Sequence, residues 1–225
     1  MALAHGVASI VTDGLVFALD AGNTKSYPGS GSTWTDTVGG NNGTLTNGPT
    51  FSSDNGGYFE FPNSNSYIQL SSPTLTTPTS LSVEVWVRVT DTSVSYSRFL
   101  SNRDSNTDGF EAGFTSTNKW YLQINGVASN ISSATVNQDQ WYHVVWNYNG
   151  SLGKIFVDGV LIQTVSFGSQ TINTTTAATI GAVSHQTSSV QNTFDIGALR
   201  VYNNKALTAT EVLQNYNAHK TRYGH

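Results

Sequence analysis

Hydrophobic residues recur at every second position in many short segments of the chain, which is the spacing of β-strands that bury one face. The clearest segment is 81–89, in which valine occupies positions 83, 85, 87 and 89 and Trp86 belongs to the opposite face. Segment 141–148 alternates less cleanly, but it is rich in the β-branched and aromatic residues that strands prefer. The same pattern predicts further strands at 15–20, 58–61, 67–70, 97–101, 109–114, 120–124, 153–157, 160–165, 178–182 and 194–202. The chain is therefore predicted to be all-β.

Short turn sequences separate the predicted strands. Asp158-Gly159 connects 153–157 to 160–165, and a two-residue Asp-Gly connection favours a type I′ turn because both positions tolerate positive φ. Other turn sequences are Asn55-Gly56-Gly57, Asp108-Gly109, Asn125-Gly126 and Asn149-Gly150. About a dozen short strands at this spacing, with no linker between them, predict one domain with a sandwich, jelly-roll or barrel architecture.

The two ends of the chain depart from this pattern. Residues 1–12 precede the predicted domain, 13–225, and are expected to form an N-terminal arm or an edge strand. Near the other end, Thr208 and Glu211 have the spacing of a capping box, and the apolar residues that follow predict a short helix at about 208–220. We expect this helix to cover one end or edge of the sandwich. The alternative is that it docks a partner.

Composition narrows the classes of function. The chain has 10 Lys and Arg against 14 Asp and Glu, for a net charge of −4, and no basic run that would bind a nucleic-acid backbone. No apolar stretch is long enough for a membrane-spanning helix, and Met1 to Asp13 lack the charged and apolar regions of a secretory signal peptide. The absence of cysteine excludes thiol catalysis and Cys zinc sites. We therefore expect no nucleic-acid partner, no membrane insertion and no cofactor.

A set of short motifs, taken in order, resembles one known family. The motifs are Gly14–Asp20, Gly57–Phe61 leading to Tyr67-Ile68, Leu81–Val89 with its central Trp, Trp141–Val145, Lys154–Val160, Ile180–Ala182, and Leu199–Asn203 followed by Ala206–Thr208. In this order they resemble the concanavalin A-like lectin/glucanase superfamily, in particular its laminin G-like branch. The resemblance implies a jelly-roll sandwich of two antiparallel sheets, which the predicted C-terminal helix would complete.

The first and last parts of the domain narrow the resemblance further. Asp20–Asn23, Ser26–Gly31 with Trp34, and Gln214–Ala218 look like laminin G-like domains of tailed-phage particle proteins. This implies a virion component without enzymatic activity, as a capsid decoration, tail or fibre protein. Its expected partners are other virion proteins, further copies of itself in a homo-oligomer, and host-surface glycans. The alternatives are a stand-alone carbohydrate-binding lectin module or a glycoside hydrolase.

Catalytic residues are not evident in the sequence. Retaining glycoside hydrolysis needs two carboxyl groups about 5–5.5 Å apart. Only Asp104, Asp108 and Glu111 cluster locally, and they flank a predicted turn rather than sharing a strand face. The family's hydrolase pattern of acids at i, i+2 and i+5 is absent, although acids from distant strands could still meet. His143 lies between Trp141 and Val145 on a predicted strand, so we expect it to be a packed histidine rather than a base. No catalytic residue is assigned.

A calcium site is possible at one loop. Asp104, Asn106 and Asp108 with Gly109 match the first half of an oxygen-ligand loop, but Thr115 stands where the bidentate Glu is required. The other interpretation is a polar hairpin loop. The resemblance also implies acids at three positions where this chain has other residues, namely Pro62, Ser66 and Gly197. No metal site is therefore assigned.

Carbohydrate binding would use exposed aromatic rings beside polar side chains. The candidates are Trp34, Tyr96, Trp120 and Tyr148, whose polar neighbours favour partial exposure. Each of them could instead fill the core, so the ligand-binding residues stay unassigned from the sequence.

Overall fold

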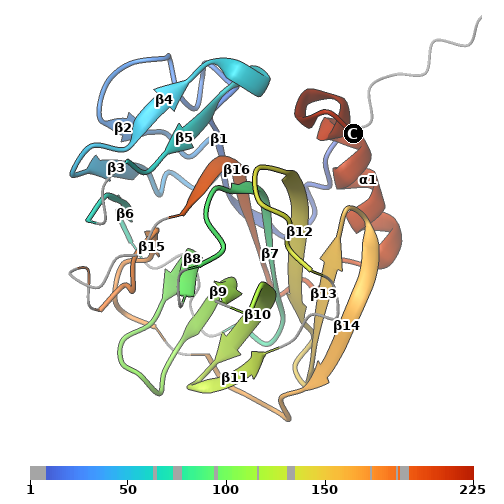
Figure 1. Cartoon of the computed structure of the whole chain (residues 1–225). Coiled ribbons are helices and arrows are strands. Elements are labelled where there is room, and N and C mark those ends of the chain that lie inside the picture. Colours follow the sequence, from blue (N-terminus) through green and yellow to red (C-terminus); the bar gives the residue numbers. More distant parts are fainter. Residues whose placement is uncertain are drawn as a thin grey trace, which may run out of the picture.

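Two antiparallel sheets pack face to face in the computed structural model, which describes residues 9–62, 65–72, 78–93, 96–115, 117–130, 135–172, 174–185, 187 and 193–225 (Figure 1). Sheet A contains, in spatial order, β14 (Val160–Ser166), β13 (Leu152–Val157), β12 (Trp141–Tyr148), β7 (Leu81–Val89), β16 (Phe194–Asn203), β5 (Tyr58–Glu60) and β4 (Thr50–Ser52), with β1 (Leu15–Asp20) also paired to β16. Sheet B contains β11 (Val127–Asn130), β10 (Lys119–Ile124), β9 (Phe110–Thr115), β8 (Tyr96–Asn102), β15 (Thr179–Ile180), β6 (Tyr67–Leu70), β3 (Gly43–Thr46) and β2 (Thr33–Trp34). The predicted two-sheet antiparallel sandwich is confirmed.

The core lies between the sheets and follows the period-two pattern. All four valines of β7 at positions 83, 85, 87 and 89 are fully buried in it, whereas Trp86 belongs to a separate cluster on the outer face of sheet A. Sheet B contributes large rings such as Phe99, Phe114 and Trp120. Burial of these apolar side chains, at roughly 25 cal/mol per Å² removed from water, is the main driving force for pairing the sheets.

Turn chemistry sets the hairpin between β13 and β14. Asp158 has φ of 50° and Gly159 has φ of 83°, as a type I′ connection requires. Asn125 and Gly126, between β10 and β11, repeat this geometry with φ of 47° and 75°. The turn predicted from Asp158-Gly159 is therefore confirmed.

The C-terminal segment forms α1 (Ala209–His219) and the 3₁₀ helix η2 (Lys220–Tyr223). The predicted capping box is confirmed, because Thr208 Oγ1 accepts the Glu211 N–H at 3.3 Å and Glu211 Oε2 accepts the Thr208 N–H at 2.8 Å. The prediction that the helix covers an end or edge of the sandwich is confirmed only in part, because α1 contacts the edge strand β14 but most of the segment does not lie over that edge. The segment instead covers the outer face of sheet A, where Tyr223 packs on Trp86 and Trp141. The physical reason is that these two large indoles point away from the core and would otherwise face water.

Most of the β14 edge of sheet A stays exposed. β14 alternates between exposed and half-buried residues, and Val160 keeps 64% of its surface. At the other terminus, residues 9–12 form no strand, and the Val11 N–H donates to Asn215 Oδ1 of α1 at 2.8 Å. Residues 1–8 lie outside the described chain, so the division into an arm, 1–12, and a domain, 13–225, stays a prediction.

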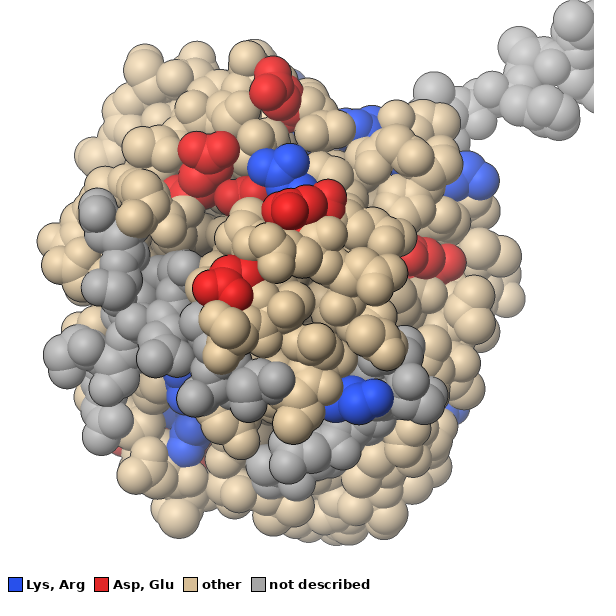
Figure 2. All heavy atoms as spheres, in the orientation of Figure 1, with Lys and Arg blue, Asp and Glu red and all other residues tan. Residues whose placement is uncertain are grey.

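The surface reflects the low charged fraction of the sequence. Uncharged residues cover most of the face in Figure 2, and the acidic side chains gather in its upper half around a basic one. In the described part of the chain, no helix is long and apolar enough to cross a membrane.

Candidate functional site

The outer face of sheet B carries a cluster of polar side chains. On β9, alternation turns Phe110, Ala112 and Phe114 into the core, so Glu111 and Gly113 face outward. On β10, Trp120, Leu122 and Ile124 point inward, and the intervening Lys119, Tyr121 and Gln123 therefore point outward. Register then places Arg98 of β8 and Tyr121 of β10 on either side of Gly113. A side chain at Gly113 has no room, because its Cβ would lie 1.9 Å from the Ser97 carbonyl oxygen.

Glu111 is the centre of this cluster and is almost fully buried. Tyr121 Oη donates to Glu111 Oε1 at 2.6 Å. Two arginines approach the other carboxylate oxygen, with Arg98 Nε at 3.1 Å and Arg103 Nη1 at 3.4 Å from Oε2. A buried carboxylate needs such charged partners, since an unpaired one would be very costly to desolvate.

Tyr121 keeps its proton at neutral pH. Burial raises its pKa well above the usual value, and the neighbouring Glu111 charge raises it further. The phenol is therefore a hydrogen-bond donor to Glu111 and not a nucleophile or a base. It fixes one carboxylate oxygen while the arginines fix the other.

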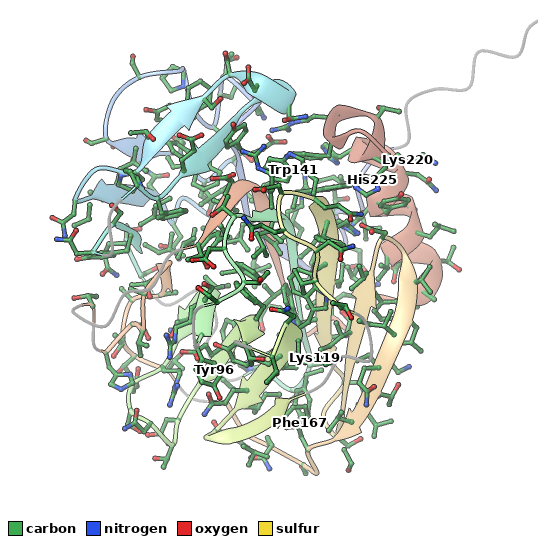
Figure 3. All side chains as sticks on the ribbon, viewed as in Figure 1. Tyr96, Lys119, Trp141, Phe167, Lys220 and His225 are labelled. Carbon is green, nitrogen blue, oxygen red and sulfur yellow. The ribbon has the colours of Figure 1, made fainter. Side chains whose placement is uncertain are left out.

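The accessible side of the cluster is formed by Tyr96, Arg98 and Lys119, which we call the Tyr96 platform. Tyr96 retains 38% of its surface, and its ring meets the Tyr121 ring edge-on at 5.4 Å between centroids. The Arg98 guanidinium lies 5.6 Å from the Tyr96 centroid, within the range of a cation–π contact. Figure 3 shows Tyr96 and Lys119 over the strands of sheet B, apart from Trp141, Lys220 and His225 near the C-terminal segment.

The other aromatic candidates are core residues. Trp34, Trp120 and Tyr148 are fully buried, so none of them offers a ring to a ligand. Tyr96 alone among the four is exposed. The sequence could not separate them because polar neighbours flank all four rings.

His143 is a packed histidine, as predicted. It is fully buried between the Trp86 and Tyr216 rings, with centroids 5.1 and 5.9 Å away. Its Nε2 lies 3.3 Å from Glu84 Oε1, and Glu84 is itself fully buried beneath α1. This network supports the C-terminal helix and is closed to substrate.

The possible calcium loop uses its acceptors within the protein. Both oxygens of Asp104 accept N–H groups of Thr175 and Thr176 at 2.8–3.0 Å. The Arg103 guanidinium donates to the carbonyl oxygens of Ser105 and Asn106, which places a positive charge where a cation would have to enter. Across the described residues, no group of three His, Cys, Asp or Glu side chains is arranged to hold a metal ion. The geometry favours the polar hairpin loop over a calcium site.

One pair of acids from distant strands does meet. Asp195 of β16 lies directly opposite Glu60 of β5 on the outer face of sheet A, and Arg88 Nη2 lies 2.7 Å from Asp195 Oδ2. Burial, together with the Glu60 and Asp139 charges, raises the pKa of Asp195 to about 6 against the opposing effect of Arg88. The sequence reasoning missed this pair, because finding it requires the register between segments 58–61 and 194–202.

A family model gives the chain its classification. The model of the concanavalin A-like lectin/glucanases superfamily, in its laminin G form, matches residues 62–213. The chain belongs to the concanavalin A-like lectin/glucanase superfamily. No curated protein sequence matches it.

Solved structures of this superfamily's fold resemble the chain at low sequence identity. A Trypanosoma rangeli sialidase superposes with a TM-score of 0.68 at 14% identity, over 96% of this chain and 35% of the sialidase. The receptor binding domain of botulinum neurotoxin type G gives 0.65 at 16% identity, over 91% of this chain and 51% of that one. The binding domain of Paraclostridial mosquitocidal protein 1 gives 0.69 at 15% identity, over 91% and 52%. The chain thus spans about a third to a half of these structures, and the likeness concerns the fold.

The structure explains why Gly197 and Ser66 stand at two positions where the family resemblance implies an acid. A Cβ at Gly197 would lie 2.2 Å from the Tyr223 hydroxyl, so an acid there would collide with the C-terminal segment. Ser66 is fully buried, and its Oγ donates to the Asn47 carbonyl at 2.8 Å. Both positions therefore serve packing in this chain.

Proposed function

We propose that this chain is a non-enzymatic binding module that recognises acidic glycans through the Tyr96 platform and is displayed on a phage particle. Tyr96 stacks against a sugar ring, while Arg98 and Lys119 bind its carboxylate or sulfate group. The observation that carries the proposal is the exposed Tyr96 ring beside the Arg98 guanidinium, which Glu111 holds in place.

The charge of this face supports an acidic ligand. Arg98 and Lys119 of the platform are both basic, whereas the whole chain has a net charge of −4. Arginine suits this role, since its planar fork pairs with carboxylate and related oxyanions. The low-identity likeness to a neurotoxin receptor binding domain and to a mosquitocidal binding domain is consistent with a recognition role.

The absence of hydrolase activity is part of the proposal. The Glu111 cluster contains one carboxylate, already bonded to Tyr121 and two arginines, and a carboxylate-pair mechanism needs two. The specific observation in favour of a hydrolase is the Asp195–Glu60 pair, in which the pKa of Asp195 is raised to about 6.

The particle context rests on the sequence resemblance in Asp20–Asn23, Ser26–Gly31 and Gln214–Ala218. On that ground we propose localisation in the virion, as a capsid decoration, tail or fibre protein, with other virion proteins and further copies of the chain as partners. Mass spectrometry of purified particles should detect the chain, and light scattering should give a homo-oligomer. Particles that lack it, with glycan binding retained, would favour a stand-alone lectin module.

The glycan site is tested on an array of acidic and neutral glycans. Tyr96→Ala and Arg98→Ala should each weaken binding by about tenfold or more, the loss expected for a central aromatic or arginine contact. Leu161→Ala and Lys154→Ala, on β14 and β13 of the other sheet, are the matched controls and should bind as the unchanged protein does. Binding that survives both platform variants, or an array with no acidic glycan bound, would contradict the proposal.

A further inference from the structure

A cavity lies apart from the Tyr96 platform and is lined by residues of β1, β16 and α1. It is open to solvent and has a volume of about 300 Å³, and its walls include Ala18 and Asp20 of β1, Arg200 of β16, and Ala218 and His219 of α1, with Asn23 at one side. Pockets for small ligands begin at roughly 300 Å³. The cavity therefore has room for one small molecule.

Three polar groups converge on this cavity: Arg200 and His219 are hydrogen-bonded to each other, and Asp20 Oδ2 lies near both without a direct hydrogen bond to either. Asp20 Oδ2 lies 3.8 Å from Arg200 Nη2 and 3.8 Å from His219 Nε2, which is too far for direct hydrogen bonds. Arg200 Nη2 and His219 Nε2 lie 3.3 Å apart. A single oxygen on the cavity side of these three atoms, rather than in their plane, can accept from the arginine and donate to the carboxylate. A hydroxyl group has this donor and acceptor capacity.

The polar groups are fixed before any ligand arrives. Arg200 is almost fully buried, and its Nη1 donates to Glu84 Oε1 at 2.7 Å. Asp20 Oδ1 accepts from Arg222 Nη1 at 2.6 Å and from the Gly22 N–H at 2.9 Å, which leaves Oδ2 turned toward the cavity side. Such preorganisation reduces the entropy lost on binding.

The charges around the cavity balance. Arg200 and Arg222 face the carboxylates of Glu84 and Asp20. Burial, reinforced by Arg200, lowers the pKa of His219 to about 4 from 6.5, so its ring is neutral at pH 7. These charged side chains are already paired, so none is free to neutralise a charged ligand. A neutral ligand with hydroxyl groups can still hydrogen-bond to the donors and acceptors of the cavity.

We propose that this cavity binds a neutral polyhydroxylated ligand of monosaccharide size, with one hydroxyl placed between Asp20, Arg200 and His219. Asn23 contributes further polar atoms at the side, and the methyl groups of Ala18 and Ala218 contact the carbon face of the ring. This site is separate from the Tyr96 platform and takes a different class of ligand, so either can exist without the other.

The test is a nuclear magnetic resonance titration of the 15N-labelled full chain with D-glucose, D-galactose, D-mannose and N-acetyl-D-glucosamine. At least one sugar should shift the amides of Ala18, Asn23 and Ala218 saturably, with a Kd on the order of 1 mM for a ligand of this size. Ala218→Leu fills the cavity without altering its polar groups and should weaken that binding by about tenfold or more. Asn217→Leu, which places the same side chain at an exposed neighbour on α1, should leave it unchanged.

Tyr96→Ala separates this site from the platform, because it should leave the cavity shifts intact. The proposal is overturned if no sugar shifts these amides, if the shifts persist in Ala218→Leu, or if they move with Tyr96→Ala. It is also overturned if inorganic phosphate, and none of the sugars, produces them, because the cavity would then be an anion site.

Discussion

Trp86 of β7 and Tyr223 of η2 stack face to face, with ring centroids 4.3 Å apart and planes inclined by 14°. Trp86 points away from the core between the sheets, so this stack lies on the outer face of sheet A. The C-terminal segment is therefore a structural layer of the fold. Its α1 part also supplies Ala218 and His219 to the cavity lined by Asp20 and Arg200, so stability and that proposed binding site depend on the same C-terminal segment.

Removing the Tyr223 ring should be strongly destabilising. Tyr223 is buried against Trp86 and Trp141, and truncating a buried aromatic residue to alanine typically costs about 3–5 kcal/mol. Tyr223→Ala should therefore lower the free energy of unfolding by that amount in urea denaturation. Leu213→Ala is the control, because Leu213 on α1 is 47% exposed and should change stability by less than about 1 kcal/mol. Equal effects of the two variants would show that the ring is not docked as described.

Replacing Gly197 by the acid that the family resemblance implies should disturb the packing of the C-terminal segment on sheet A. Any Cβ at Gly197 would approach the Tyr223 hydroxyl to 2.2 Å, and overpacking of this kind costs about 1–3 kcal/mol or more. Gly197→Asp should therefore lower the unfolding midpoint and increase hydrogen exchange in 209–223. In a Tyr223→Ala background the same substitution should cost much less, because the colliding hydroxyl is gone. Additive losses in the double variant would contradict this account.

Local patterns were sufficient to predict most of the sandwich. Every strand segment predicted from period-two alternation contains a strand, with shifts of one or two residues at the ends. The strands that were missed are β2, β3, β4 and β11. β3 reads Gly-Thr-Leu-Thr and β2 has two residues, so neither is long enough to show alternation, and both are set by pairing with neighbouring strands.

The candidate site was harder to predict, since its residues come together through register. Arg98, Glu111 and Tyr121 belong to three different strands, and only their pairing around Gly113 places their side chains in one cluster. The position of α1 was also predicted only in part, since the helix reaches the edge strand β14 but the segment mainly covers the outer face of sheet A. The sequence of the helix shows that one of its sides is apolar. The C-terminal segment packs against Trp86, which points outward from sheet A, and alternation within 81–89 does not indicate that the outer face of this sheet is covered.

The Asp195–Glu60 pair gives a direct test of the non-enzymatic proposal. The two acids face each other across β16 and β5, and an acid with a pKa of about 6 is suited to general acid catalysis. We expect no reducing-sugar release from any polysaccharide that the chain binds, because Asp195 is held by Arg88 at 2.7 Å as a structural ion pair. Release that is lost in both Asp195→Asn and Glu60→Gln would overturn the proposal and identify a hydrolase.

Glu84 should control the stability of the fold in acid. Burial by itself raises the pKa of Glu84, but Arg200, His143 and Asn215 stabilise the carboxylate more strongly, so its pKa is lowered to about 2 from 4.5. Because the folded-state pKa is the lower one, the unfolded chain binds the proton more tightly. The stabilisation is thus complete above pH 4.5 and is lost as the pH falls toward 2. A shift of this size corresponds to roughly 3 kcal/mol.

Glu84→Gln should remove this contribution at pH 7 and leave Arg200 buried without its closest partner. We expect the variant to be less stable than the unchanged protein by about 3 kcal/mol at pH 7, with the difference closing as the pH falls from about 5 to 2. Urea denaturation across this range measures the difference directly. His219 also titrates in acid, between pH 6.5 and 4, and the Glu84 charge raises its pKa, so the part of the difference that His219 contributes appears at higher pH than that of the Glu84 carboxyl itself. A difference that stays constant from pH 7 to 2 would mean that the Glu84 carboxylate is not stabilised by Arg200 in the folded protein.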